Sequence, residues 1–161
     1  MISEESDLLA LSKKESFFFD LDGTIYLGTD LFPGALELIE WLKHHDKHFF
    51  FLSNNSSQST SDYLKKLNGM DFSLSRENII LSQHPTLAYL KEFNFKRIFL
   101  MGTTSLKEEF QEHGFILTEK DPDILVLAFD QELTYGRLKK AAYLLQDGIP
   151  YIATHPDDRC P

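Results

Sequence analysis

The amino-acid sequence predicts an α/β fold with parallel strand pairing. Apolar runs that suit strands alternate with segments of helical period along the 161 residues, and turn-forming residues separate the two kinds of segment. The first apolar run is continuous, which is typical of strands buried on both faces of a parallel sheet. Strand and helix alternating throughout a chain is typical of α/β architectures.

The first strand is predicted for residues 16–21, and Asp22-Gly23-Thr24 ends it. Because its letters SFFFDL are apolar at successive positions, we expect both faces of this strand to be buried. The first helix is predicted for residues 35–45, since three apolar side chains share one face and a proline precedes it. These four residues are Leu38, Ile39, Leu42 and Pro33.

The alternation continues along the chain. HFFFLS at 48–53 repeats the strand pattern, and the polar residues 54–57 precede a helix over 59–68. In that helix the apolar period places Tyr63, Leu64 and Leu67 inward, and Gly69 ends it. Further strands are predicted for 79–81, 97–101, 124–129 and 151–154, and further helices for 85–93, 105–113 and 134–146. Ser and Asn punctuate the chain between 74 and 83, which fits a domain boundary there.

Charge and composition exclude several classes of partner. The chain has a formal net charge of −9, which suits a site that holds a cation. Nucleic acids and anionic membranes select for Lys/Arg patches, so neither is expected as a partner. Cys160 is the only cysteine and cannot form an intramolecular disulfide, and residues 1–15 lack the order of a signal peptide. We therefore expect a cytoplasmic protein, without the ~18-residue apolar run of a membrane span.

Three polar side chains end predicted strands. Asp20 and Asp22 close the first strand, and Ser53 closes the second. In open parallel sheets ligands bind at the carboxyl ends of strands, so these residues are the candidate site. Two carboxylates this close in sequence repel each other unless a cation or a proton separates them. Mg²⁺ fits, because it takes one or two carboxylates together with substrate phosphate oxygens.

The same residues suit the hydrolysis of a phosphate ester. Asp20 is expected to be ionised and can attack phosphorus without a general base. Asp22 can protonate the leaving oxygen and later deprotonate the attacking water. Gly23 permits a sharp turn, and the Ser53 hydroxyl can donate to a phosphate oxygen. The backbone N–H groups of Asn54 and its neighbour Asn55 are further expected donors.

The two motifs resemble those of a known family. FFFDLDGTIYLG resembles the first motif of haloacid dehalogenase (HAD) superfamily phosphatases, and FFFLSNNSS resembles their second motif. The strings FPGALELIEWL, SDYLKKL and YIATHPDDRCP are similar to the type IIA branch, which includes NagD-like proteins, 4-nitrophenylphosphatases and phosphoglycolate phosphatases. The resemblance implies a Mg²⁺-dependent phosphomonoester hydrolase that acts on a small phosphorylated metabolite through an aspartyl-phosphate on Asp20. It also implies that Asp20 and Asp22 bind the metal and that Gly23, Ser53 and Asn54 bind phosphate.

The resemblance also implies a domain organisation. Residues 1–81 would be the N-terminal part of a Rossmann-like HAD core, and 82–161 part of an inserted α/β cap that is incomplete at the C-terminus. Tyr26 and Leu27 would lie in a small flap, and His155 and Asp157 in the cap would help to select substrates. His155 departs from the Asn that is common in the family. Members of the branch also continue past Pro161 to a third-motif lysine and a fourth-motif acidic metal ligand.

Alternatives to an active phosphatase remain. Without the third- and fourth-motif residues, the chain could be a noncatalytic remnant that keeps its phosphate-binding loops. A signalling receiver domain also phosphorylates a strand-end aspartate, but the only comparable later acid, Asp130, lacks an acidic partner. A homo-oligomer is a further expectation to test, because 13% of the residues are aromatic.

Two other segments allow a functional interpretation but favour a structural one. His44, His45 and His48 suggest a metal site, although their place at a helix end beside lysines favours a solvated helix terminus. MGTTS at 101–105 could hold a phosphate at a helix start. It lacks the lysine of a P-loop, which favours a plain strand-to-helix turn.

Overall fold

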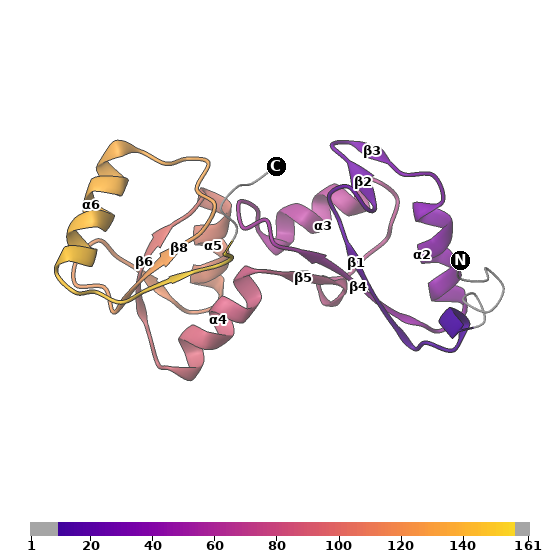
Figure 1. Ribbon diagram of the computed structural model, residues 1–161, viewed down its shortest axis with the longest axis horizontal. Coiled ribbons are helices and arrows are strands. Elements are labelled where there is room, and N and C mark those ends of the chain that lie inside the picture. Colours follow the sequence, from indigo (N-terminus) through magenta and orange to yellow (C-terminus); the bar gives the residue numbers. More distant parts are fainter. Residues whose placement is uncertain (1–9, 157–161) are drawn as a thin grey trace. The chain divides into compact units, whose positions relative to one another are not determined.

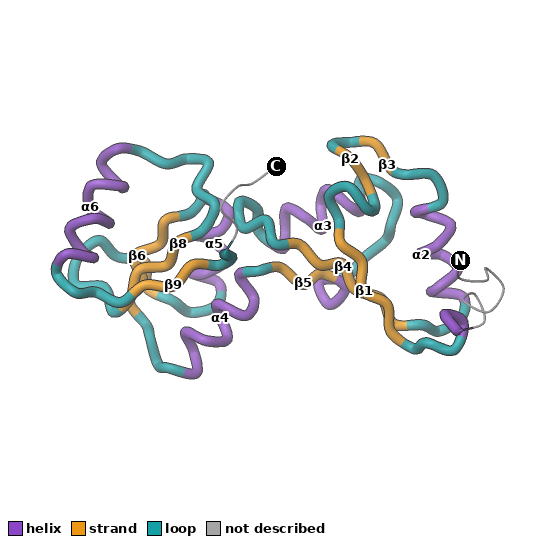
Figure 2. Tube along the Cα trace, viewed as in Figure 1, coloured by secondary structure: helices purple, strands orange, loops and turns teal. Residues whose placement is uncertain are grey.

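The computed structural model describes residues 10–156, which fold into two compact units. The first unit contains the described residues up to Leu52 together with Lys66–Ile80. The second contains Ser53–Lys65 together with the described residues from Leu81 onward. Helices and strands alternate in both units (Figures 1 and 2), so the predicted α/β class with parallel sheets is confirmed. Within the described residues, no helix is both long and apolar enough to cross a membrane.

The first unit contains a three-stranded sheet in the order β1-β4-β5. β1 (Ser16–Asp20) and β4 (His48–Ser53) pair in parallel, and Asp20 is opposite Leu52. α2 (Ala35–His44) connects them and buries Ile39 and Leu42. α3 (Thr60–Asn68) and the 3₁₀ turn η1 (Arg76–Asn78) lead from β4 to β5 (Ile79–Leu81).

The expectation that both faces of the first strand are buried is wrong. Every residue of β1 is exposed or half-buried, and the Phe18 side chain is 59% exposed. β1 is at the edge of the described sheet, so its apolar side chains do not have enough neighbours to cover them. Of the three apolar residues predicted to share one face of the first helix, Ile39 and Leu42 are fully buried and Leu38 is 40% exposed.

A short hairpin follows β1, and the apolar period did not predict it. β2 (Tyr26–Leu27) and β3 (Asp30–Leu31) pair antiparallel, with Gly28 at a φ of 63° between them. Tyr26 is fully buried, and the ammonium of Lys66 lies 3.7 Å from the centre of its ring. Leu27 is exposed, so this hairpin presents one residue inward and one to solvent.

The second unit is built on a four-stranded parallel sheet in the order β7-β6-β8-β9. Its strands are β6 (Arg97–Met101), β7 (Ile116–Leu117), β8 (Ile124–Leu127) and β9 (Tyr151–Ala153). Its helices are α4 (Gln83–Glu92), α5 (Thr104–Glu112) and α6 (Tyr135–Gln146).

Alternation along β6 and β8 directs side chains to two apolar clusters. Ile98 and Val126 belong to a cluster with Leu90 of α4 and Phe110 of α5. Their neighbours on the other face, which include Phe99 and Leu125, belong to a cluster with Ala141 and Leu144 of α6. The sheet of the second unit therefore has helices packed on both faces, as Figure 1 shows.

Candidate functional site

The carboxylates of Asp20 and Asp22 flank a buried leucine at the end of β1. Asp20 is the last residue of the strand, Leu21 is fully buried, and both aspartates are exposed. Burial of Leu21 fixes the backbone between the two acids. The structure therefore presents the predicted pair to solvent at the carboxyl end of a parallel strand, where α/β proteins bind ligands.

Gly23 closes the turn that follows this pair. Its φ of +85° lies in the left-handed region that favours glycine, and its N–H donates to the Tyr26 carbonyl at 2.8 Å. The N–H groups of Thr24 and Ile25 both donate to the Leu21 carbonyl. The Thr24 hydroxyl donates to Asp20 Oδ2 at 3.4 Å, which leaves Asp20 Oδ1 without a contact from this residue.

Ser53 is the last residue of β4 and directly follows the partner of Asp20 in the strand register. Its buried hydroxyl lies 3.0 Å from the Tyr63 hydroxyl and accepts the N–H of Asn55 at 3.2 Å. The Asn55 N–H, which the sequence analysis assigned to phosphate, therefore binds Ser53 in this structure. Asn54 is exposed, and its carbonyl accepts the Ser82 hydroxyl at 3.1 Å.

His155 lies beside the loop that follows β4. Its Nδ1 is 3.4 Å from the Ser56 hydroxyl and 3.2 Å from that of Thr154. Ser56 is fully buried, and its oxygen also accepts the N–H of Phe129 at 2.9 Å and the hydroxyl of Thr154 at 2.8 Å. Thr154 begins the loop that the resemblance assigns to substrate selection, whereas nothing in the sequence pattern singled out Ser56. Asp157 lies outside the described residues.

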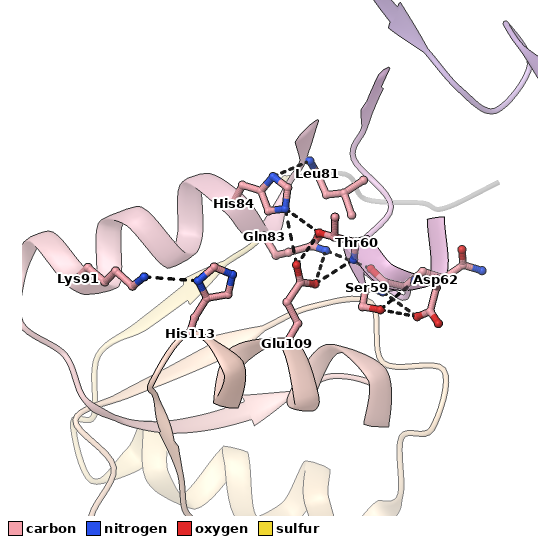
Figure 3. Close-up of polar contacts among 10 residues, drawn as sticks. Ser59, Thr60, Asp62, Leu81, Gln83, His84, Lys91, Glu109 and His113 are labelled. Carbon is pink, nitrogen blue, oxygen red and sulfur yellow. Dashed lines mark hydrogen bonds and ion pairs between the residues drawn. The ribbon is translucent and has the colours of Figure 1, made fainter. Parts of the chain in front are cut away.

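A second polar cluster in the same unit was also missed. The buried carboxylate of Glu109 accepts hydrogen bonds from Thr60 and Gln83, and His84 lies beside it (Figure 3). Burial raises the pKa of Glu109, but contacts with His84, Thr60 and Gln83 outweigh it and lower the pKa to about 2. Glu109 is therefore a stable buried anion at neutral pH.

No group of three or more His, Cys, Asp or Glu side chains gathers as a metal site among residues 10–156. The acidic pair of β1 fits Mg²⁺, which needs few protein carboxylates. Among the histidines, His44 and His45 contact the carbonyls of Glu40 and Trp41 through Nδ1, at 2.7 and 2.8 Å. The two rings therefore bind backbone carbonyls at the C-terminal end of α2, as expected for a helix terminus.

Two rival interpretations do not fit the structure. In the segment 101–105, the carboxylate of Glu132 accepts the Thr104 N–H and hydroxyl, so a protein anion already occupies the start of α5. The strand-end acid of the receiver hypothesis, Asp130, pairs with Arg137 and accepts the Glu132 N–H. Asp130 is thus bound within the fold rather than presented as a phosphoacceptor.

Comparisons with known proteins agree with the motifs. A family model for haloacid dehalogenase-like hydrolases matches residues 17–116. An acid sugar phosphatase of Staphylococcus haemolyticus is 30% identical over 151 residues, which cover 91% of this chain and 57% of that protein. The chain thus spans little more than half the length of this relative.

Solved structures share the fold. A 4-nitrophenylphosphatase from Thermotoga maritima superposes with a TM-score of 0.88 at 47% identity, covering 94% of this chain and 58% of that one. A glycerol phosphate phosphatase from Mycobacterium tuberculosis, solved with magnesium, has a TM-score of 0.79 at 24% identity, with 91% and 45% covered. The family model matches more than half of the sequence, and the chain therefore belongs to the haloacid dehalogenase-like hydrolases, in their type IIA branch.

Proposed function

We propose that this chain takes part in the Mg²⁺-dependent hydrolysis of phosphomonoesters through an aspartyl-phosphate on Asp20. The observation that carries the proposal is the exposed pair Asp20 and Asp22 at the end of β1, with buried Leu21 between them. The relatives named as phosphatases support the reaction class.

Each protein group has a role in the proposed reaction. The Asp20 carboxylate attacks phosphorus and forms an acyl phosphate while the ester P–O bond breaks. The carboxyl of Asp22 gives its proton to the leaving oxygen and then takes a proton from the water that releases inorganic phosphate. The hydroxyl of Ser53, the backbone at Gly23 and Asn54 bind the phosphate oxygens. A Mg²⁺ ion held by Asp20 and Asp22 would offset the repulsion between the substrate and the Asp20 carboxylate.

The backbone at Gly23 offers room for a phosphate oxygen. A side-chain carbon placed there would meet no atom within 4 Å, so the turn is open on that side. A glycine turn beside two carboxylates would suit a small anion if a cation offset the negative charges.

The proposed substrate is a small phosphorylated metabolite, and we propose that His155 and Asp157 help to select it. His155 contacts the loop after β4, which begins directly after Ser53. The chain has a net charge of −9, so we do not propose nucleic acids or membranes as partners. We propose that the protein is cytoplasmic. We also propose that it can form a homo-oligomer, which sedimentation would test.

The test is hydrolysis of 4-nitrophenyl phosphate by the purified chain, with Mg²⁺ or with EDTA. Turnover that requires Mg²⁺, is lost in Asp20→Asn and is kept in Asp30→Asn supports the proposal. Asp30 is a matched control because it is also an exposed strand aspartate that accepts a neighbouring threonine hydroxyl. Thermal melts followed by circular dichroism establish that both variants are folded.

Two results separate the proposal from its alternative. Turnover that survives in Asp20→Asn excludes Asp20 as the nucleophile. A folded chain that binds inorganic phosphate but hydrolyses nothing supports the phosphate-binding remnant instead.

A further inference from the structure

The carboxylate of Glu109 contacts the first residues of α3 and α4, which belong with Glu109 to the second unit. Glu109 belongs to α5 and is 3% exposed. Its Oε2 accepts the backbone N–H of Thr60 at 3.1 Å and the side-chain amide of Gln83 at 3.2 Å. Its Oε1 accepts the Thr60 hydroxyl at 2.5 Å. As Figure 3 shows, the contacts come from the first residues of α3 and α4.

The hydrogen bonds made by His84 fix the donor and acceptor roles in this cluster. The N–H of Leu81 points to its Nδ1 at 3.3 Å, so a neutral ring carries its proton on Nε2. The Nε2 atom lies 2.8 Å from Thr60 Oγ1 and 3.7 Å from Glu109 Oε1. Thr60 uses its only hydroxyl hydrogen on Glu109 and accepts from His84. Every polar hydrogen of this chain of contacts is therefore directed toward Glu109.

The cluster is located at the N-terminus of α3. Thr60 is the first residue of α3, where backbone N–H groups lack partners inside the helix. Asp62 Oδ2 accepts the N–H and the hydroxyl of Ser59 at 2.9 and 2.8 Å, so the helix also has an acceptor of its own. Glu109 is the acceptor that another helix supplies, and a carboxylate at this position is further stabilised by the helix dipole.

One helical turn connects Thr60 to the candidate site. Tyr63 follows it by three residues, is 1% exposed and places its hydroxyl 3.0 Å from Ser53 Oγ. The rigid first turn of α3 thus transmits the position of Thr60 to Tyr63. Among the described residues no strand pairs with the polar loop 54–59. The end of this loop is held by the start of α3, by the Gln83 amide, which donates to the Gln58 carbonyl as well as to Glu109, and by the Thr103 hydroxyl, which donates to the Ser57 carbonyl.

We propose that Glu109 is a positioning residue that, through the first turn of α3 and Tyr63, orients the Ser53 hydroxyl for a phosphate oxygen. This inference rests on the proposed function, in which Ser53 binds phosphate. It assigns a role in substrate binding to a residue 56 positions from Ser53 in the sequence.

The experiment compares Glu109→Gln with Glu132→Gln. Glu132 is a matched control, because its carboxylate also caps a helix start, at Thr104 of α5, and its hydrogen bonds reach neither α3 nor the loop 54–59. Glu109→Gln replaces one carboxylate oxygen by an NH₂ group, which cannot accept a hydrogen bond from the N–H or the hydroxyl of Thr60. We expect this loss to raise KM for 4-nitrophenyl phosphate about tenfold, with a smaller change in kcat. Glu132→Gln should leave both constants unchanged.

A double-mutant cycle distinguishes positioning from a merely structural role. In the Ser53→Ala background, Glu109→Gln should not raise KM further, because the hydroxyl that it orients is gone. If Glu109→Gln and Ser53→Ala each raise KM by the same factor alone and in combination, the proposal is overturned. If Glu109→Gln does not fold, Thr60→Val removes one of the contacts at nearly constant shape and takes its place in the cycle.

Amide hydrogen exchange tests the same inference without turnover. The Asn55 N–H donates to Ser53 Oγ and should exchange about tenfold faster in Glu109→Gln than in wild type. Unchanged exchange in the folded variant overturns the positioning role. A wild-type chain that neither hydrolyses the ester nor binds inorganic phosphate overturns the proposed function instead, while the exchange rate still decides whether Glu109 orients Ser53.

Discussion

The hydroxyl of Ser53 lies 3.0 Å from the phenolic oxygen of Tyr63, and both side chains are buried. Ser53 Oγ also accepts the N–H of Asn55. If Tyr63 donates, both lone pairs of the serine oxygen are used, and its single hydrogen is left for an incoming acceptor. In that arrangement Ser53 can donate to a phosphate oxygen, as the proposed function requires.

Removing the phenolic oxygen should weaken phosphate binding without unfolding the chain. Tyr63→Phe keeps the buried ring and loses one neutral hydrogen bond, so we expect KM for 4-nitrophenyl phosphate to rise by up to about tenfold. Tyr143→Phe, in an exposed ring of α6, is the control and should not change KM. Equal KM values for wild type and Tyr63→Phe would contradict the role of this contact.

A methyl group at Gly23 should affect the site more than the fold. Gly23 and Gly148 have φ values of +85° and +84°, and an added carbon meets no atom within 4 Å at either position. Gly23→Ala and Gly148→Ala should each lose about 1–2 kcal/mol, from the left-handed backbone alone. Only Gly23→Ala should also lower kcat/KM, since its turn places Asp22. A similar loss of activity in both variants would attribute the effect to stability.

The strands that the sequence predicts with correct bounds are short apolar runs between polar or turn residues. β4, β5 and β6 match the predicted ranges 48–53, 79–81 and 97–101. The two-residue strands β2, β3 and β7 were missed, because two residues show no period. The exposure of Phe18 could not be predicted either, since burial depends on which elements lie next to a strand.

The residues of the candidate site also differ in whether the sequence predicts them. Asp20, Asp22 and Ser53 are local strand-end residues, so the sequence alone identifies them. Glu109 occurs in the string KEEFQEH, which has the charges of a solvated helix face. Its burial depends on Thr60, 49 residues away, and only the packing of three helices reveals it.

The stability of the second unit should fall as Glu109 takes up a proton. Its pKa is lowered from an ordinary value of 4.5 to about 2 in the folded chain, so the unfolded state binds the proton first as the pH falls. The stabilisation is complete above about pH 4.5 and is lost toward pH 2, with a magnitude of about 3 kcal/mol. Urea unfolding between pH 6 and pH 2.5 measures this loss.

Glu109→Gln provides the control for this pH dependence. The variant has no carboxylate at that position, so its stability should fall less steeply over the same pH range, although it starts from a lower value. Burial and, as the smallest of the effects on that carboxyl, the charge of Glu109 raise the pKa of Asp62, so Asp62 also titrates differently in the variant. The difference between the two curves therefore reports mainly on Glu109. Parallel curves would show that its pKa is not lowered by folding.

The edge of β1 should govern self-association of the chain. Phe18 is 59% exposed, its ring stacks on Phe50 with the ring centres 5.1 Å apart, and β1 is at the edge of the sheet formed by the described residues. An exposed apolar edge strand offers unpaired backbone groups to a second copy, and a lysine at such an edge opposes pairing. Phe18→Lys should therefore reduce the concentration dependence of the sedimentation coefficient. Tyr135→Lys replaces an aromatic ring that is 81% exposed at the start of α6, away from any sheet edge, and should have no effect. If both substitutions reduce association equally, added charge rather than the β1 edge is the cause.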